Sequence, residues 1–201
     1  MSRKKGKLYV ITGPSGTGKG CICKELLKDI RNVFSVSMTT REAREGETEG
    51  KDYFFVSREE FLDNIEKGNF LEYASVFDNL YGTPKDMVIR QIAKGYNVIL
   101  DIDVQGALQV KKVMPEAILV FLLPPSLEEL RRRLEGRATD SHEVIEKRLG
   151  QALNEIKLIG EYDYYVINDE IEKAATEVQS IMTAENCRVP DRATEIIKQY
   201  E

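Results

Sequence analysis

Residues 13–20 combine residue types that suit the binding of phosphate groups. They read GPSGTGKG and match G-x-x-x-x-G-K, in which backbone N–H groups converge on phosphate oxygens and the lysine reaches the β- and γ-phosphates. A strand-like run (7–12) precedes them and apolar residues at helical spacing (22–30) follow, so an ordinary glycine-rich turn is the weaker interpretation. The expected triphosphate-binding residues are Gly13, Pro14, Ser15, Gly16, Thr17, Gly18, Lys19, Gly20 and Cys21.

Residue 20 departs from the usual form of this motif. It is glycine where a serine or threonine hydroxyl commonly ligates Mg²⁺. The ion would then be held mainly by triphosphate oxygens and water, which Mg²⁺ tolerates because it usually keeps several waters. The sequence therefore predicts no direct protein ligand for Mg²⁺, although a carboxylate such as Asp101 could steady the ion.

Cys21 falls in the first turn of the expected helix, close to Lys19. Helix N-termini and nearby cations favour the thiolate, so we expect a reactive thiol that nucleotide protects. A small residue that only fills space is an equal alternative. Cys23 should point to another side of the helix, inward, which makes a local disulfide unfavourable.

Five further segments resemble the guanylate kinase family, and the resemblance runs from about residue 6 to 185. It implies ATP-dependent phosphorylation of GMP, and of dGMP, to the diphosphate, with Mg²⁺ accompanying ATP. It also implies a P-loop fold with a GMP-binding insertion and a helical lid. The segments are SVSMTTREAREGETEGKDYFFV (35–56), FLEYA (70–74), YGTP (81–84), ILDID (99–103) and RRLEGR (132–137).

The resemblance places four side chains around the phosphate of GMP. Arg41 and Arg44 supply guanidinium forks, which match the geometry of a dianionic phosphate. Tyr53 and Tyr81 can add hydroxyl donors. Taken singly, the arginines could be surface residues and the tyrosines sheet aromatics, but the joint pattern favours the site.

The base of GMP presents N1–H and N2–H₂ donors beside the O6 acceptor, and Glu72 is expected to accept from the two donors. Ser37 and Thr83 can bond the base edge, while Asp101 is assigned a base or metal-shell contact by the resemblance. Glu72 alone could equally be a solvent-facing strand residue. Asp101 and Asp103 lie in an apolar run, where an unpaired carboxylate is costly, so a functional role is favoured for both.

Residues 127–149 are rich in arginine, and Arg133, Arg137 and Arg148 match the lid arginines of the family. Charge spreads over the oxygens of a transferring phosphoryl group, so catalysis depends on positioning and electrostatic stabilisation. Arginines on a closing lid supply both and exclude water. No general base is needed, because the phosphate nucleophile is already ionised. The expected catalytic residues are Lys19, Arg44, Arg137 and Arg148, and those expected at ATP also include Arg133 and Asn168.

Other charged residues of this region have a plainer interpretation. Arg131 and Arg132 are expected on a solvated helix, paired with Glu128, Glu129 or Glu135. His142 is expected at the surface near a helix start. Asn168 matches a family position at the adenine of ATP, with a simple turn residue as the alternative.

The elements that must position these residues alternate between strand and helix. Continuous apolar runs at 97–103 and 117–123 suit parallel strands buried on both faces. Capped helices are expected from Ser57 to Gly68 and after Ser126, and another after Thr83-Pro84, with threonine as the cap. The remaining expected elements are strands at 34–37, 52–56, 70–82 and 164–167, and helices at 141–159 and 170–185. The apolar residues expected on one side of the 141–159 helix are Val144, Ile145, Leu149, Leu153 and Ile156.

This alternation predicts an α/β fold, specifically a three-layer α/β/α core around a mainly parallel sheet. The expected domain spans 6–185, followed by a C-terminal tail at 186–201. Its core comprises about 6–36, 89–125 and 158–185. The GMP-binding insertion is expected at 37–88 and the lid at about 126–157.

The composition bounds the class of protein. The 201 residues are 42% hydrophobic and 31% charged, which suits one soluble globular unit. A net charge of −5 argues against nucleic acid as a partner, and the apolar runs are too short for a membrane span. Three cysteines and one histidine make a zinc site improbable. We expect a cytoplasmic protein, with monomer or homo-oligomer left open.

Two other functions fit parts of the pattern. A non-catalytic guanylate-kinase-like binding module would typically have a degraded phosphate loop, whereas Lys19 is present here. A kinase of another nucleotide or small molecule would differ at the base-reading positions. Glu72 together with Ser37 is the feature that discriminates these possibilities.

Overall fold

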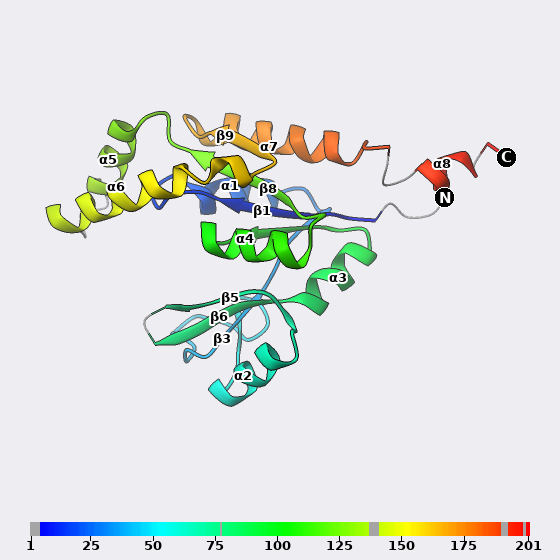
Figure 1. Cartoon of the computed structure of the whole chain (residues 1–201), viewed down its shortest axis with the longest axis horizontal. Helices are drawn as coiled ribbons and strands as arrows, with labels where there is room; N and C mark the ends of the chain where they lie inside the picture. The colour runs from blue at the N-terminus through cyan, green and yellow to red at the C-terminus, as the bar shows by residue number, and fades with distance from the viewer. Residues whose placement is uncertain (1–4, 77, 137–140, 190–192, 199) are drawn as a thin grey trace.

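Five parallel strands form the central sheet of the computed structural model, which describes residues 5–76, 78–136, 141–189, 193–198 and 200–201 (Figure 1). Their order is β2-β7-β1-β8-β9, so the first strand lies in the middle. Each neighbouring pair is parallel, and the three central strands are buried almost throughout, as their apolar runs predict. The strands are β1 (Leu8–Thr12), β2 (Asn32–Phe34), β7 (Asn97–Asp101), β8 (Ile118–Leu123) and β9 (Tyr164–Ile167).

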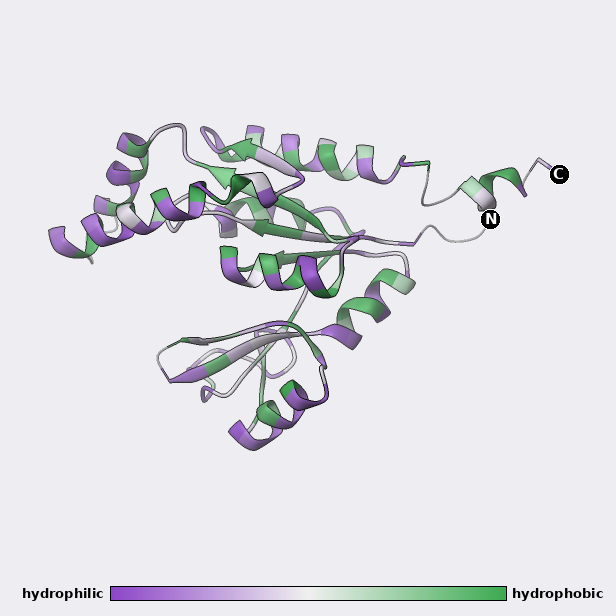
Figure 2. Ribbon diagram, viewed as in Figure 1, coloured by the Kyte–Doolittle hydropathy of each residue, from purple (hydrophilic) through white to green (hydrophobic). Residues whose placement is uncertain are grey.

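Helices cover both faces of this sheet. One hydrophobic cluster joins the sheet to α1 and α7, and a second joins its other face to α3 and α4 (Figure 1). Figure 2 shows the hydrophobic colouring concentrated along the central strands between these layers. The expected three-layer α/β/α fold is confirmed. The helices are α1 (Lys19–Leu26), α3 (Lys85–Ala93), α4 (Val104–Val113) and α7 (Ile171–Glu185).

A second sheet lies beyond α4, with strand order β4-β3-β6-β5 (Figure 1). Phe61, Phe70 and Leu80 form a small core between this sheet and α2. Leu71 instead joins the cluster that contains Ala107 of α4, so the two sheets are linked through that helix. The elements are β3 (Ser37–Thr39), β4 (Tyr53–Phe55), α2 (Arg58–Glu66), β5 (Phe70–Val76) and β6 (Asn79–Pro84).

Two helices project from one end of the central sheet (Figure 1). They are α5 (Leu127–Glu135) and α6 (His142–Ile156), and Leu130, Leu134 and Ile145 contribute to a core of their own. A 3₁₀ turn (Ile159–Glu161) follows α6, and α8 (Ala193–Ile197) lies in the tail. Within the described residues, no helix has the length and apolar character that a membrane span requires.

Several local expectations were wrong. The first helix ends at Leu26, and Ile30 is 89% exposed. The strand expected at 34–37 is instead the end of β2 and the start of β3. Thr83 does not cap α3, since the N-cap is Pro84 and the Thr83 hydroxyl bonds Glu72.

Two further differences concern helices. The apolar run at 97–103 ends as a strand at Asp101, and Asp103 caps the unanticipated α4 by accepting from Gly106 N at 2.8 Å. On α6, Ile145 and Leu149 face α5, but Val144 and Leu153 are 40% and 43% exposed. Val144 and Leu153 are nine residues apart and so lie on opposite sides of the helix, one at each edge of its buried face.

Candidate active site

The 13–20 loop connects the carboxyl end of β1 to the N-terminus of α1, where ligands bind in open parallel sheets. Gly13 has φ 141°, and a Cβ there would lie 2.2 Å from Leu122 O. Gly18 has φ 85°, and its Cβ would lie 2.5 Å from Nδ2 of Asn168. Neighbouring elements therefore impose glycine at both positions and hold the loop's amides in place.

Lys19 folds back over this loop. Its Nζ donates to Gly13 O at 2.6 Å and to Pro14 O at 3.2 Å. Burial lowers the pKa of the lysine, and the nearby Asp101 carboxylate opposes that shift. The ammonium thus lies at the mouth of the loop, in a position to exchange carbonyl oxygens for phosphate oxygens.

Asp101 lies beside the same loop. It ends β7 next to Ile11 of β1, and a Cβ on Gly20 would be 3.8 Å from its Oδ2. Burial raises the pKa of this carboxyl, and the charge of Lys19 opposes the rise. Among the described residues, no group of three or more His, Cys, Asp or Glu could hold a metal ion. The partly buried Asp101 carboxylate is an acidic group beside Gly20 and Lys19.

Other loop side chains differ in orientation. Thr17 is fully buried and its Oγ1 donates to Pro14 O at 2.8 Å, so it braces the loop from inside. Ser15 and Cys21 are exposed. Cys23 is buried, as expected, and burial raises the pKa of its thiol to about 12. All three cysteines are free.

Arg133 and Asn168 line one cavity of about 460 Å³ together with Gly16 and Gly18. Asn168 donates from Nδ2 to Thr17 O at 2.6 Å, while its Oδ1 is buried and has no partner among the described residues. Arg133 Nε donates to Glu129 Oε1 at 2.7 Å. The cavity adjoins the loop, and the Asn168 side chain links the cavity wall to the backbone of the loop.

Glu72 is buried in the second sheet, with 7% of its surface exposed. Thr83 Oγ1 donates to its Oε1 at 2.6 Å. Burial raises the pKa of Glu72, the Thr83 hydrogen bond lowers it, and the charge of Asp103 raises it further. The Oε2 atom faces α4, where a Cβ on Gly106 would come within 3.2 Å. One carboxylate oxygen of Glu72 is thus held by the Thr83 hydroxyl, and the other lies against the backbone of α4 at Gly106, which has no side chain.

Arg41 and Arg44 lie on the segment that follows β3. Both terminal nitrogens of Arg41 bond the carboxylate of Glu47, and its guanidinium lies 5.3 Å from the ring centroid of Tyr53. Tyr53 and Tyr81 meet edge to face with centroids 5.9 Å apart. The structure therefore brings four of the expected phosphate contacts into one region, and Ser37 pairs with Tyr53 at the start of β3.

The lid residues are only partly described. Arg137 lies outside the described residues, and Arg148 is half-buried on α6. Arg132 pairs with Glu129 as expected, whereas Arg131 pairs with Glu146 of α6. His142 is exposed, with Nε2 3.8 Å from a Glu146 oxygen.

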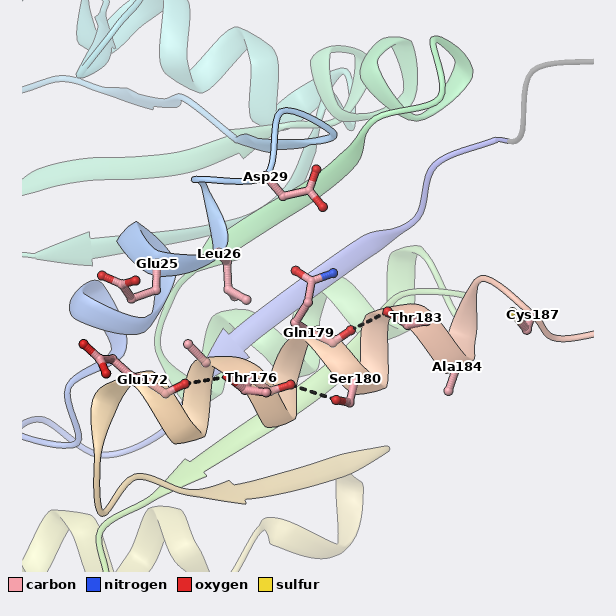
Figure 3. Close-up of a pocket in the computed structure, with 11 residues that line it drawn as sticks. Glu25, Leu26, Asp29, Glu172, Thr176, Gln179, Ser180, Thr183, Ala184 and Cys187 are labelled. Carbon is pink, nitrogen blue, oxygen red and sulfur yellow. Dashed lines mark hydrogen bonds between the residues drawn. The ribbon is translucent and has the colours of Figure 1, made fainter.

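A groove of about 620 Å³ lies between α1 and α7, away from the loop (Figure 3). The hydroxyls of Thr176, Ser180 and Thr183 follow one side of α7, but each donates to a carbonyl one turn earlier in the same helix. Because these donors are satisfied within the helix, the groove has no set of groups that matches the chemistry above.

Sequence reasoning missed how three residues contribute to these sites. Glu47 lies within the 35–56 segment, and the sequence predicts no role for it, although an acid six residues from Arg41 is a candidate partner for the guanidinium. A functional role is favoured for Asp103 from the sequence, but the apolar run does not indicate that it caps α4 and lies near Glu72. Gly106 gave no signal at all, because its closeness to Glu72 depends on how α4 packs against β5.

Comparison with known proteins finds strong similarity along the whole chain. A family model described as Guanylate kinase matches residues 5–185. A guanylate kinase of Clostridioides difficile is 49% identical over 202 residues, covering 100% of this chain and 98% of that protein. One from Clostridium tetani is 53% identical over 186 residues, 92% and 89% of the two chains. The crystal structure of guanylate kinase from Anaplasma phagocytophilum superposes with a TM-score of 0.71 at 40% identity, covering 94% and 90%.

Proposed function

Because this chain belongs to the guanylate kinase family, we propose that its phosphate loop and its second sheet are the ATP and GMP sites of one transfer reaction. The chain is a nucleoside monophosphate kinase that uses ATP to phosphorylate GMP, giving ADP and GDP. The segment from Asp101 to Gly106 supports the assignment of both sites, because it borders the loop at Gly20 and the carboxylate of Glu72. The ATP and GMP sites would therefore lie on either side of the 101–106 segment, so the two substrates would bind next to each other.

On the ATP side, we assign the phosphates to residues 13–20 and to the first turn of α1, including Cys21. Lys19 would turn from the carbonyls of Gly13 and Pro14 to the β- and γ-phosphates. The cavity with Arg133 and Asn168 would take the adenine end of ATP, since it adjoins Gly16 and Gly18.

On the GMP side, Glu72 would accept from N1–H and N2–H₂ of guanine while Thr83 and Ser37 contact the base edge. Arg41, Arg44, Tyr53 and Tyr81 would hold the phosphate. We assign these contacts to the insertion at 37–88. The 2′-hydroxyl of the ribose has no role in this set, so dGMP is expected to serve as a second substrate.

The lid at about 126–157 would close over both sites. Arg137 and Arg148 would then stabilise charge on the transferring phosphoryl group and exclude water from it. The nucleophile is a phosphate oxygen of GMP that is ionised at neutral pH, so the protein needs no general base. Lys19 and Arg44 would position the phosphates of ATP and GMP, and with Arg137 and Arg148 they are the residues that we assign to catalysis.

The residues around Gly20 fit a Mg²⁺ ion that is carried by ATP oxygens and water. Gly20 offers no hydroxyl, but the partly buried Asp101 carboxylate lies beside it and can accept from a bound water. When bound, the ion neutralises charge on the phosphates as transfer proceeds. We propose the cytoplasm as the location, where ATP and GMP are both available.

A coupled assay of ADP release tests the substrate assignment. GMP, dGMP, AMP, CMP and UMP are compared at equal concentration, each with and without Mg²⁺. Rapid turnover with GMP and dGMP and slow turnover with the others is expected, and only when Mg²⁺ is present. Equal rates with AMP would contradict the role of Glu72 as the reader of the base.

A further inference from the structure

Glu47 joins the two arginines that we assign to the phosphate of GMP. Its Oε1 and Oε2 accept from Nη2 and Nη1 of Arg41, both at 2.8 Å. Oε2 also accepts from the backbone N–H of Arg44 at 2.8 Å. One carboxylate therefore ties the side chain of Arg41 to the backbone at Arg44.

This contact uses only one edge of the Arg41 guanidinium. A guanidinium carries five N–H donors in a plane, with one fork between the two terminal nitrogens and a second between Nε and Nη2. Glu47 occupies the terminal fork, and Nη1 also donates to the carbonyl of Glu42 at 2.7 Å. The Nε–H is buried and makes no hydrogen bond among the described residues, although Tyr81 lies close enough to the guanidinium to help raise the pKa of Arg41. The side fork is therefore the edge that still needs an acceptor.

Aromatic rings fix the guanidinium from other directions. Its central carbon lies 5.3 Å from the ring centroid of Tyr53 and 5.8 Å from that of Phe55, within the range of cation–π attraction. The side chains of Arg41 and Glu47 are 14% and 21% exposed, so the pair is largely covered. A long and flexible side chain is thus held in one orientation before any nucleotide binds.

We propose that Glu47 is a positioning residue for the phosphate of GMP, which holds Arg41 by its terminal fork so that the Nε–Nη2 fork receives phosphate oxygens. By fixing the Arg44 amide it also sets the path of the 44–47 turn, which closes with Glu47 N donating to Arg44 O at 3.1 Å. The inference rests on the proposed function, because it takes Arg41 as a phosphate ligand.

The opposite arrangement makes a different prediction. Glu47 could occupy the place of the incoming phosphate, so that GMP must displace it. The bonds to Arg41 hold the pKa of Glu47 down at about 2, so the carboxylate is ionised at any practical assay pH. Replacing it by glutamine therefore removes a full charge, and the sign of the change in GMP affinity separates the two arrangements.

The test is Glu47→Gln, with the exposed neighbour Glu45→Gln as the matched control. We expect KM for GMP to rise roughly 10- to 100-fold, as for loss of a charged hydrogen-bonded contact, while kcat and KM for ATP change by less than about threefold. Inhibition by guanosine, which lacks the phosphate, should be unchanged. A general loosening of the sheet would weaken guanosine as well.

An unchanged or lowered KM for GMP in Glu47→Gln, or an equal loss of guanosine affinity, overturns the proposal. Arg41→Lys separates this failure from that of the phosphate site itself. If Arg41→Lys raises KM for GMP and Glu47→Gln does not, only the role of Glu47 is wrong; if neither raises it, Arg41 does not bind phosphate.

Two further variants keep the test decisive. In the double variant with Arg41→Lys, Glu47→Gln should add little to the increase in KM, because both act through one guanidinium. Glu47→Asp keeps the charge on a shorter arm and should give a KM between those of wild type and Glu47→Gln. If Glu47→Gln does not fold, Glu47→Asp must still raise KM for GMP selectively, and normal KM there overturns the proposal.

Discussion

The two phosphate-binding regions of this chain are built from different parts of the polypeptide. The 13–20 loop uses backbone amides and glycines that neighbouring strands hold in position. The second sheet uses side chains that hold one another, as in the pairs Arg41–Glu47 and Glu72–Thr83. The loop is therefore ready for its ligand through its backbone geometry, whereas the sheet depends on pairs of polar groups.

This difference has a consequence for substitutions. A site made of backbone amides loses function when a glycine is replaced by a residue with a Cβ, or when a key charged side chain is removed. Such a site binds phosphate groups and does not distinguish one base from another. A site made of paired side chains can reject a ligand that leaves a buried group unsatisfied. Selectivity should therefore depend on the sheet and rate on the loop, and the predictions below test that division.

The largest effect is expected for the choice between GMP and AMP in Glu72→Gln. AMP has an acceptor at N1 where GMP has a donor, so the wild-type carboxylate would face AMP unpaired. Sites of this kind discriminate by about 10⁴-fold. The ratio of kcat/KM for GMP over AMP should collapse toward unity in Glu72→Gln, measured beside the exposed control Glu66→Gln. A preserved ratio would mean that the sheet does not read the base.

A loss of rate on the order of 100-fold or more is expected for Lys19→Ala. Its ammonium stabilises phosphates that are absent from the free protein, so the far-ultraviolet circular dichroism spectrum should match wild type. Lys24→Ala, on the exposed side of the same helix, is the control. Near-normal turnover in a folded Lys19→Ala enzyme would contradict the assignment of the 13–20 loop to the phosphates of ATP.

A smaller effect is expected on stability as pH changes. Burial raises the folded-state pKa of Glu72 above its unfolded value, so the folded chain binds the proton more readily. Stability from this group is therefore greatest below the unfolded pKa and falls as pH rises through the folded one. Glutamine cannot ionise, so nucleotide-free Glu72→Gln should be more stable than wild type at pH 8.

The gain should be about 1.4 kcal/mol for each unit by which the pKa is raised, and it should shrink toward pH 4. Thermal unfolding of wild type, Glu72→Gln and Glu66→Gln at both pH values measures it. If Glu72→Gln is less stable than wild type at pH 8, the Thr83 hydrogen bond outweighs the cost of burying the charge.

The smallest expected effect is a few-fold decrease in the rate of alkylation of Cys21 when nucleotide binds. This measurement reports on the phosphate loop and not on the second sheet. Mg·ATP should slow the modification of the exposed Cys21 without affecting Cys187, while the buried Cys23 should stay unmodified. Activity should fall as Cys21 reacts, and a Cys187→Ser background removes the competing signal. Equal rates at Cys21 with and without nucleotide would show that this thiol does not face the phosphates.

The same contrast explains what the sequence could predict. Strand, glycine loop and helix follow one another in the chain, so the loop was identified from contiguous residues. The pairing of Glu72 with Thr83 depends on how β5 lies against β6, where the register shifts between Phe70 and Glu72. No local pattern contains that irregularity. The dipeptide Thr83-Pro84 instead predicts that Thr83 caps a helix, while the resemblance places the same residue at the base of GMP.

Tertiary packing accounts for the other errors. The apolar residues of α6 form one wide face, and only its packing on α5 determines that Ile145 at the centre of that face is buried while Val144 at its edge is exposed. Asp103 looked like part of a strand because the apolar run continues through Ile102, yet a capping hydrogen bond from Gly106 starts α4 there. The family resemblance predicts roles for Glu72 and the arginines, but it does not indicate how Glu47 or Gly106 contacts them.

Gly18 is constrained by a residue from the far end of the sheet. The amide of Asn168, 151 residues from Thr17 in sequence, occupies the space that a Cβ at position 18 would need. A left-handed conformation is open to asparagine as well as glycine, so Gly18→Asn is excluded mainly by this neighbour. In evolutionary terms the two sites are epistatic: a smaller residue at 168 must arise before position 18 can vary, and the reverse order passes through an impaired intermediate.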